Sequence, residues 1–279
     1  MEDSYKQSAP QTIAQAIRQV LERNSIAALA TLVEAREDVG AKLLVEETGE
    51  RHGSLGSLAL DERVASFAAT FLDSRAEAQT FKLAEIADQL LPGVEGRVLF
   101  ERIEPEPRLV ICGAGHVGAS LARLARFIGY RTTVIDDRAD FVARERFPDE
   151  EIELIAAADG WADALRLSIG AGRGVSVAVV TRGHNEDEEC MRAIMRTHPD
   201  YVGLIGSRRR TNIVLERLRD AGVDENRLRD VRAPVGLDIG AVSPQEVALS
   251  ILAEIVAERR GGTGQSLSSW RREKRRDEG

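Results

Sequence analysis

The sequence predicts an α/β protein, with a doubly wound parallel sheet in its C-terminal part and a smaller α/β domain before it. After residue 107, short aliphatic runs alternate with segments of helical periodicity, which is typical of a parallel sheet covered on both faces. A glycine-rich turn joins the first of these runs to the helix after it. Prolines in IEPEP (103–107) neither continue a helix nor donate to an interior ladder, so they divide the chain.

Before this division the sequence predicts helix, strand, strand, helix and strand. Apolar residues at helical spacing predict the helices, and aliphatic runs predict the strands. The helices are expected at 11–23 and 60–73, and the strands at 26–35, 41–46 and 97–103. Residues 1–104 are therefore expected to form the smaller, N-terminal domain.

After the division, strands and helices are expected to alternate. The strands are predicted at 108–112, 131–137, 152–156, 175–181 and 201–207. The helices are predicted at 119–129, 139–146, 161–168, 186–197, 207–222 and 243–260. The last helix opens with a capping box, in which Ser243 caps and Glu246 reaches back, and Gly261 follows its end. Residues 105–262 are expected to form the second domain, and 263–279 a flexible basic tail.

The composition narrows the class of protein. Among 279 residues, 43% are hydrophobic and 30% charged, as in a soluble globular protein, and no apolar run is long enough to span a membrane. A net charge of −8 argues against nucleic acid as the main partner. The polar N-terminus does not resemble a secretory signal, so we expect a cytoplasmic protein. Cys112 and Cys190 form no C-x-x-C pair and are expected to be reduced thiols.

The glycine-rich turn is GAGHVG at 113–118, and it contains His116 and Val117. In a dinucleotide-binding fold, Gly113 would permit the turn, Gly115 would let a pyrophosphate approach, and Gly118 would pack helix against strand. Asp136, 23 residues after Gly113, ends the next predicted strand, where an acid accepts hydrogen bonds from ribose hydroxyls. This favours an NAD-like nucleotide over one with a 2′-phosphate. The alternative is a tight turn without a ligand.

Two histidines lie near the same predicted sheet edge. His116 is either a first-turn residue whose ring caps or packs, or a group that faces the pyrophosphate. His184 and Asp187 follow the fourth strand, and their i, i+3 spacing suits proton transfer or metal ligation. The alternative is a polar loop that leads into a helix whose first turn carries acids. Whether a metal binds is left open.

Two further stretches could contribute to a ligand site. Gly206 and Ser207 lie where the fifth strand passes into a helix, before the arginines at 208–210. One of these arginines could hold an anion together with the Ser207 hydroxyl, because successive helical residues point in different directions. The stretch 232–244 is glycine-rich and apolar, with Asp238 as its only acid, and could close over a ligand.

Several motifs in order resemble the XdhC/CoxI family, whose members are accessory proteins for xanthine dehydrogenase and carbon monoxide dehydrogenase. These motifs are GAGHVG (113–118), VIDDR (134–138), RFP (146–148), TRGHNED (181–187), YVGLIGSRRR (201–210) and APVGLDIGAVSPQEVALSILAEI (233–255). The resemblance covers residues 108–260, and more loosely 40–64. It implies a small N-terminal domain, a Rossmann-like C-terminal domain, and a role in maturing molybdenum hydroxylases by cofactor delivery or sulfuration.

The resemblance also implies a cofactor site and a partner. On the resemblance, its residues would be Gly113, Gly115, His116, Gly118, Asp136, His184 and Asp187. Val117 of the same turn, and Gly206 and Ser207 of the loop after the fifth strand, complete the expected cofactor site. The cofactor would be an NAD-like dinucleotide or the molybdenum cofactor as a molybdopterin dinucleotide. The partner would be an apo molybdenum hydroxylase, with no catalytic residue assigned to this chain; a homodimer stays open.

Two positions depart from the family pattern. Arg182 stands where the family usually has histidine, which weakens a paired-histidine metal site. Many members carry Gly-Gly-Cys in the first domain, whereas the loop at 53–58 has no cysteine to hold a soft metal.

Two other functions stay open. One is an NAD-dependent oxidoreductase with His116 or His184 as proton donor, and the other is a nucleotide-sensing regulatory module.

Overall fold

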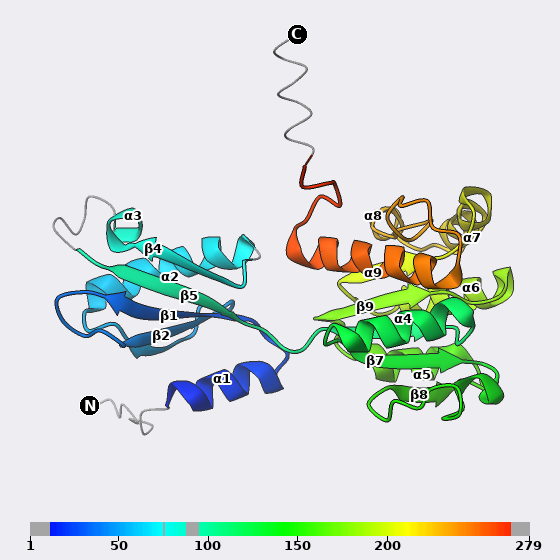
Figure 1. Cartoon of the computed structure of the whole chain (residues 1–279), viewed down its shortest axis with the longest axis horizontal. Helices are drawn as coiled ribbons and strands as arrows, with labels where there is room; N and C mark the ends of the chain where they lie inside the picture. The colour runs from blue at the N-terminus through cyan, green and yellow to red at the C-terminus, as the bar shows by residue number, and fades with distance from the viewer. Residues whose placement is uncertain (1–11, 75, 88–94, 269–279) are drawn as a thin grey trace, which may run out of the picture. The chain divides into compact units, whose positions relative to one another are not determined.

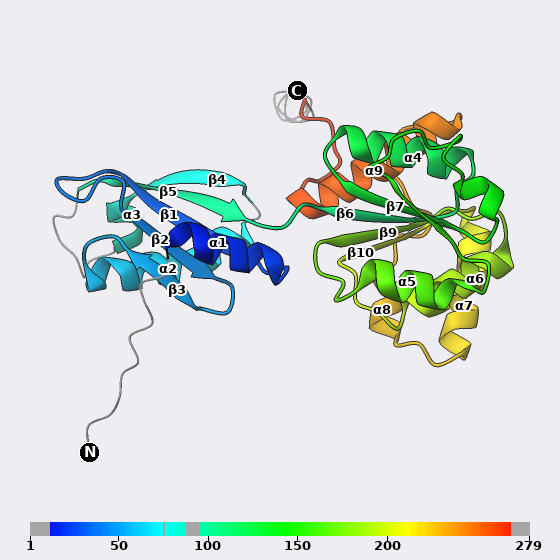
Figure 2. The ribbon, with the colours of Figure 1, turned by 90° about the horizontal axis from the view of Figure 1, so that it is seen from below.

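The computed structural model describes residues 12–74, 76–87 and 95–268. The chain forms two compact units, Met1–Pro105 and Glu106–Gly279, which are described separately (Figures 1 and 2). Part of the predicted basic tail, from residue 269 on, lies outside the described residues, as does the first residue of the helix predicted at 11–23.

The N-terminal unit is an antiparallel sheet with helices on both faces. The strands lie in the order β3-β2-β1-β5-β4. Their bounds are β1 (Ala27–Glu34), β2 (Lys42–Glu46), β3 (Arg51–Ser54), β4 (Ala78–Lys82) and β5 (Arg97–Ile103). The helices are α1 (Ile13–Glu22), α2 (Leu58–Asp73) and α3 (Leu83–Ala87).

The central strand β1 explains why both faces are covered. Its first six residues are all buried. Because side chains alternate along a strand, Ala28 and Ala30 pack on one face with Phe71 of α2, while Leu29 packs on the other face with Val20 of α1. A capping box at Thr12 starts α1.

The C-terminal unit is a parallel sheet in the order β10-β9-β6-β7-β8, which confirms the predicted doubly wound fold. Its strands are β6 (Arg108–Cys112), β7 (Arg131–Asp136), β8 (Glu153–Ala156), β9 (Val175–Val179) and β10 (Tyr201–Leu204). The helices are α4 (His116–Phe127), α5 (Trp161–Ile169), α6 (His184–Ile194), α7 (Arg208–Asp220), α8 (Glu225–Arg229) and α9 (Pro244–Arg260), with a 3-10 turn η2 (Ala139–Val142).

Each face of this parallel sheet has its own apolar core. Ile111 of β6 packs with Leu121 of α4 and Ile251 of α9, whereas the preceding residue Val110 packs on the opposite face with Trp161 and Met191. Figure 2 shows α4 and α9 on one side of the sheet and α5, α6 and α7 on the other. The near-continuous aliphatic composition of the strands follows from burial on both faces.

Several elements differ from the sequence prediction. The helix predicted at 139–146 is only the 3-10 turn η2, because Ala143 already adopts extended backbone. The elements β3, β4, α3 and α8 were not predicted; each has only four or five residues, too few to show a clear period.

The strand order reverses beside β6. The neighbours of β6 are β7 and β9, and the chain leaves β6 for one face through α4 and leaves β9 for the other through α6. Such a reversal opens a crevice at the carboxyl ends of the strands, which is where ligands bind in open α/β sheets. The glycine-rich turn follows β6 directly and therefore lies at this point.

Candidate functional site

Three strand-to-helix loops meet at the carboxyl edge of the C-terminal sheet. The loop after β6 lies next to the loop after β9, since Val180 donates its N–H to the Cys112 carbonyl over 2.8 Å. The loop after β10 joins on the other side, where Ile205 donates to the Val179 carbonyl over 2.9 Å. The parallel topology therefore brings loops from residue 113 to residue 207, about 90 positions apart in the chain, to one edge of the sheet.

The three glycines of the 113–118 turn have different surroundings. A Cβ on Gly113, where φ is +113°, would lie 2.6 Å from the Val180 carbonyl oxygen, and one on Gly118 would lie 1.9 Å from the Gly113 carbonyl oxygen. By contrast, a Cβ on Gly115 would meet nothing within 4 Å, and its φ of −67° suits any residue. Folding therefore requires Gly113 and Gly118, whereas only an approaching ligand would require Gly115.

Helix α4 presents an uncapped N-terminus in front of this open space. Gly115 is its N-cap and offers no side chain to the first backbone N–H groups, and the first turn holds no acid. Unpaired N–H groups and the helix dipole make such an end suitable for an anion. His116, the first helical residue, is exposed, while Val117 is half-buried against the α4–α9 core.

Arg146 adds positive charge beside the same turn, and sequence reasoning missed it. Its Nη2 donates to the Ala114 carbonyl over 3.1 Å, and its guanidinium lies 4.4 Å from the centre of the Phe141 ring. Its Nε is buried without a hydrogen-bond partner, and no ion pair reaches it within the described part of the chain. The RFP motif at 146–148 was the available signal, but nothing in it indicated that the arginine would reach the turn.

Asp136 supports the turn and is not free to accept from a ligand. Its Oδ2 accepts from the Ala114 N–H over 2.8 Å, and Arg138 donates to both oxygens from its side chain and to Oδ1 from its N–H. Burial would raise the pKa of Asp136, but the hydrogen bonds from Arg138 and from the Ala114 N–H outweigh it and hold that pKa below its ordinary value. A ribose would have to displace Arg138.

Arg182 and Asp137 form a bridge between the loops after β9 and β7. The two guanidinium nitrogens donate to the two carboxylate oxygens over 2.8 and 2.9 Å. Arg182 also pairs with Glu186 over 3.0 Å. Since β9 and β7 flank β6, the bridge joins the loops on either side of the glycine turn.

His184 and Asp187 lie in the first turn of α6 but in different surroundings. His184 is exposed, whereas the Asp187 carboxylate is fully buried. Thr181 donates to one oxygen of Asp187, and Arg210 donates to the other through Nε, over 2.9 Å, and Nη2. Burial raises the pKa of Asp187 above its ordinary value, against these bonds. The carboxylate therefore anchors α7 to α6 and has little capacity left for His184.

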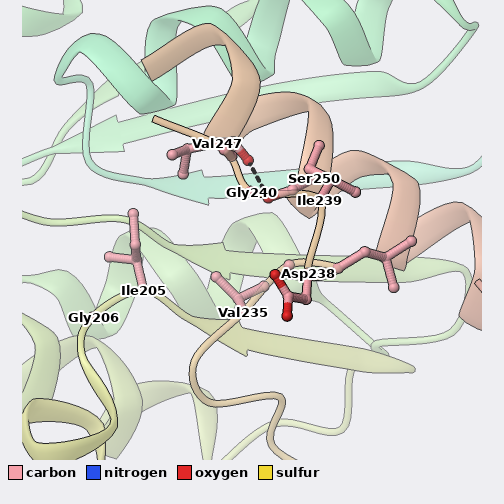
Figure 3. Close-up of a pocket in the computed structure, with 11 residues that line it drawn as sticks. Ile205, Gly206, Val235, Asp238, Ile239, Gly240, Val247 and Ser250 are labelled. Carbon is pink, nitrogen blue, oxygen red and sulfur yellow. Dashed lines mark hydrogen bonds between the residues drawn. The ribbon is translucent and has the colours of Figure 1, made fainter. Parts of the chain in front are cut away.

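Ser207 and Gly206 shape the start of α7. The Ser207 hydroxyl accepts from the Arg210 N–H over 3.3 Å as a helix cap. Of the three arginines at 208–210, Arg210 binds Asp187. Gly206 lines a pocket of about 390 Å³ together with part of the stretch 235–241 (Figure 3).

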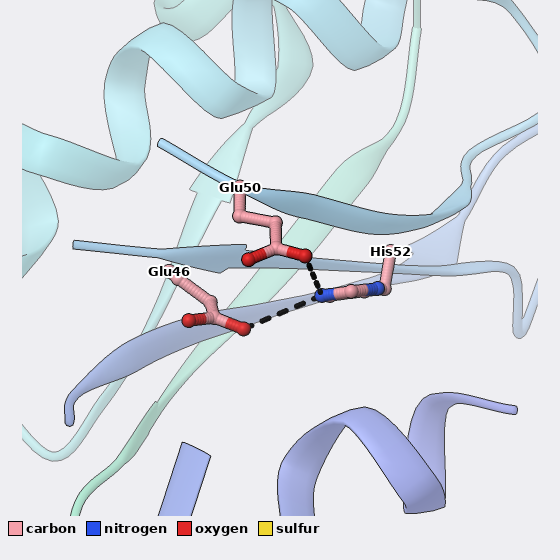
Figure 4. Close-up of side chains that lie close together, drawn as sticks. All are labelled: Glu46, Glu50 and His52. Atoms are coloured by element: carbon pink, nitrogen blue, oxygen red, sulfur yellow. Dashed lines mark hydrogen bonds and ion pairs between the residues drawn. The ribbon is translucent and has the colours of Figure 1, made fainter. Parts of the chain in front are cut away.

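The first domain contains two polar clusters that the sequence did not indicate. His52 Nε2 lies 3.3 Å from Glu46 Oε1 and 3.6 Å from Glu50 Oε1, which gives the buried Glu46 carboxylate a partner (Figure 4). The loop at 53–58 is held by Asp61, whose oxygens accept from the Ser54 hydroxyl over 2.7 Å and the Leu55 N–H over 2.6 Å. Glu46 and His52 lie on the paired strands β2 and β3. The alternation of side chains along these two strands was the sequence signal available for the His52 cluster.

Both cysteines are buried and free. Cys112 ends β6 and Cys190 lies in α6. Burial, followed by the neighbouring Cys112, raises the pKa of the Cys190 thiol well above its ordinary value. A thiolate is the nucleophile and the metal ligand, so Cys190 is an unreactive thiol in this fold.

Among the described helices, none has both the length and the apolar composition of a membrane span.

Comparisons with known proteins agree with this architecture. Residues 109–255 match the model of the XdhC Rossmann domain, and residues 20–82 match that of the XdhC and CoxI family. The Escherichia coli K12 protein YqeB, described as uncharacterized, is 35% identical over 158 residues, which are 57% of this chain and 28% of that protein.

Two other relatives have more specific names. A Bacillus subtilis 168 protein, described as a probable xanthine dehydrogenase subunit, is 30% identical over 163 residues, 58% of this chain and 46% of that protein. The molybdenum cofactor insertion chaperone PaoD of Escherichia coli K12 is 31% identical over 111 residues, 38% of this chain and 35% of that protein. The matches thus span less than half the length of each of these relatives.

A solved structure, described as a xanthine dehydrogenase from Bacillus halodurans, aligns with 92% of this chain and 98% of its own chain. The two are 18% identical, with a TM-score of 0.49.

Proposed function

Because the chain belongs to the XdhC and CoxI family, we propose that it binds the molybdenum cofactor and delivers it to a molybdenum hydroxylase of the xanthine dehydrogenase type. The cofactor is the cargo, held by its phosphate-bearing part in the C-terminal unit. The names of two relatives support this role, since one is a molybdenum cofactor insertion chaperone and the other belongs to a probable xanthine dehydrogenase.

The observation that carries the proposal is the anion cradle at the end of β6. It consists of the open space at Gly115, the uncapped N-terminus of α4, and the Arg146 guanidinium without an ion-pair partner in the described residues. Backbone N–H donors and the positive charge of Arg146 lie beside the same turn, and phosphate recognition uses both kinds of group. The cradle therefore suits a pyrophosphate, which a molybdopterin dinucleotide and an NAD-like nucleotide both carry.

Each residue of the cradle has a separate role in this proposal. Gly113 and Gly118 fix the turn, and the N–H groups of His116 and Val117 donate to the phosphate oxygens. Arg146 balances their charge, while Asp136 holds the turn through Ala114. The bound cofactor supplies redox chemistry only in the hydroxylase that receives it.

Delivery is favoured over sulfuration by this chain. Both of its cysteines are buried, and a persulfide-carrying thiol has to be accessible and ionised to pass on sulfur. The sulfur would then come from another protein. For the same reason, the molybdenum is not held on a thiolate of this chain. An oxidoreductase is less favoured, because the carboxylate beside His184 is engaged by Arg210 and Thr181.

Reconstitution tests the delivery role. The protein is loaded with molybdenum cofactor and mixed with a purified apo-hydroxylase, and the activity gained is compared with that from free cofactor at equal concentration. We expect a faster and larger gain of activity with the loaded protein. An equal gain from free cofactor alone would contradict delivery.

A further inference from the structure

A pocket at the end of β10, on the same sheet edge as the anion cradle and separated from it by β9, contains a single charged side chain. It has a volume of about 390 Å³, within the usual range for small-molecule sites, and lies between the end of β10, the stretch 235–241 and the first turns of α9. The side chains of Ile205, Val235, Ile239 and Val247 form apolar walls, and the Asp238 carboxylate is the one charged group among the labelled lining residues (Figure 3).

The stretch that forms the pocket is held firmly by the protein itself. Val235 donates its N–H to the Leu204 carbonyl over 3.0 Å. Glu254 of α9 accepts from the Gly236 N–H over 2.9 Å and from the Tyr201 hydroxyl over 2.6 Å. A Cβ on Gly236 would lie 2.5 Å from the Ser250 hydroxyl oxygen, so the backbone fits closely against α9. The pocket is therefore preformed, which lowers the entropy cost of binding.

Asp238 is available to a ligand. Its side chain is exposed, and no hydrogen bond or ion pair engages its carboxylate in the parts of the chain that the structure describes. The other side-chain polar group in the lining, the Ser250 hydroxyl, already donates to the Val247 carbonyl over 2.9 Å. An ionised carboxylate only accepts hydrogen bonds, so the pocket selects for donors.

The pocket lies on the same edge and the same face as the cradle. Helix α9 packs beside α4 on one face of the sheet, and its first turns share the pocket with Ile205 and Gly206, which follow β10. Figure 2 shows α4 and α9 as neighbouring helices on one side of the sheet. A dinucleotide bound at a switch point extends along this edge, so its phosphates and one of its rings can occupy different strand ends.

We infer that this pocket binds a 2-amino-4-oxopyrimidine ring, with Asp238 accepting from the amino group and the adjacent ring N–H. Pterins and guanine both carry this pair of neighbouring donors. The two donors can form two charge-assisted hydrogen bonds to one carboxylate. The flat ring would lie against the aliphatic walls. This inference rests on the proposed function, since it takes the ring and the phosphate to belong to one cargo.

The test changes donors into acceptors on the ring, and adds a donor at residue 238, in matched combinations. Binding of 6-hydroxymethylpterin and of 6-hydroxymethyllumazine, whose 2-oxo group accepts where the pterin donates, is measured by calorimetry and by ligand fluorescence. The purified full chain, Asp238→Asn and Asp220→Asn are compared; Asp220 is an exposed residue at the end of α7 that does not line the pocket. GMP, XMP and AMP give the corresponding series for nucleotides.

Wild type and Asp220→Asn are expected to prefer pterin over lumazine, and GMP over XMP and AMP, by about tenfold to one hundredfold. Asp238→Asn is expected to reverse the first preference, because an amide both accepts from the ring N–H and donates to the 2-oxo group. Comparing the affinities for 6-hydroxymethylpterin and GMP shows whether the pocket takes the pterin or the guanine ring. Equal affinities for these rings in wild type, or an unchanged preference in Asp238→Asn, would overturn the inference.

Failure of this inference can be told from failure of the proposed function. If wild type and Asp238→Asn both activate the apo-hydroxylase but show the same ring preference, the delivery role stands and the assignment of Asp238 is wrong. If wild type prefers pterin but delivers no cofactor, the ring assignment stands and the delivery role is wrong.

Discussion

The Arg182 guanidinium donates to both carboxylate oxygens of Asp137 over 2.8 and 2.9 Å, which joins the loops on either side of the glycine turn. Arg182 stands where the family pattern usually has histidine. A cation is therefore kept beside the proposed phosphate site, and a neighbouring acid neutralises it. Hydrogen bonding to Asp137 raises the pKa of Arg182, so the guanidinium stays charged at every physiological pH.

We expect Asp137→Asn to bind an anionic ligand several-fold more tightly than wild type. The substitution removes a negative charge near the cradle and releases Arg182, while the partly exposed pair contributes at most about 1 kcal/mol to stability. Titration with pyrophosphate at low and high salt measures this, and the salt dependence should become steeper in the variant. Weaker binding in the variant would indicate that Asp137 itself contacts the ligand.

The Asp136 carboxylate should make stability depend on acidity. Its pKa is lower in the folded than in the unfolded chain, so the folded state gains stability that is fully present above an unfolded pKa of about 3.9 and is lost as the pH falls through the folded value. Asp136→Asn is expected to lose about 2 kcal/mol near neutral pH, and this difference should shrink below about pH 4. Urea unfolding at several pH values checks it. A difference that stays constant down to pH 2 would contradict this role of the carboxylate.

Substitutions at two glycines of the turn should differ in their effect on stability, because Gly118 is needed for folding and Gly115 is not. Gly118→Ala would force a Cβ against the Gly113 carbonyl and is expected to cost about 3 kcal/mol or more. Gly115→Ala meets open space at an ordinary φ, so its stability should stay within about 1 kcal/mol of wild type. Thermal unfolding of both variants measures the contrast. Equal destabilisation would show that the turn is not built as described.

Much of this fold could be predicted from local sequence. The aliphatic runs of β6 and β9 and the capping box at Ser243 are strong local signals, because burial on both faces and helix capping each impose a composition over a few neighbouring residues. The short strands β3 and β4 were missed, because only their pairing with β2 and β5 makes them strands.

The polar contacts of the site could not be predicted in the same way. Asp187 and Arg210 are 23 residues apart and meet because β9 and β10 are neighbouring strands. Arg182 and Asp137 are 45 residues apart and meet across β6, where the strand order reverses. The sequence placed Asp136 and Asp187 at the sheet edge but did not reveal that arginines occupy their carboxylates. Arg146 has no local periodic signal at all, although it reaches the turn.

We propose that the turn at 113–118 holds a phosphate-bearing molybdenum cofactor. Mass spectrometry and molybdenum analysis of the native protein, purified from cells that make the cofactor, test it most directly against Gly115→Asp and the control Gly262→Asp. Gly262 follows α9, where a Cβ makes only ordinary contacts at 3.5 Å or more. We expect a molybdopterin-type ligand on wild type and on Gly262→Asp, and at least tenfold less on a folded Gly115→Asp protein. Equal ligand on all three proteins, or none on wild type, would contradict it.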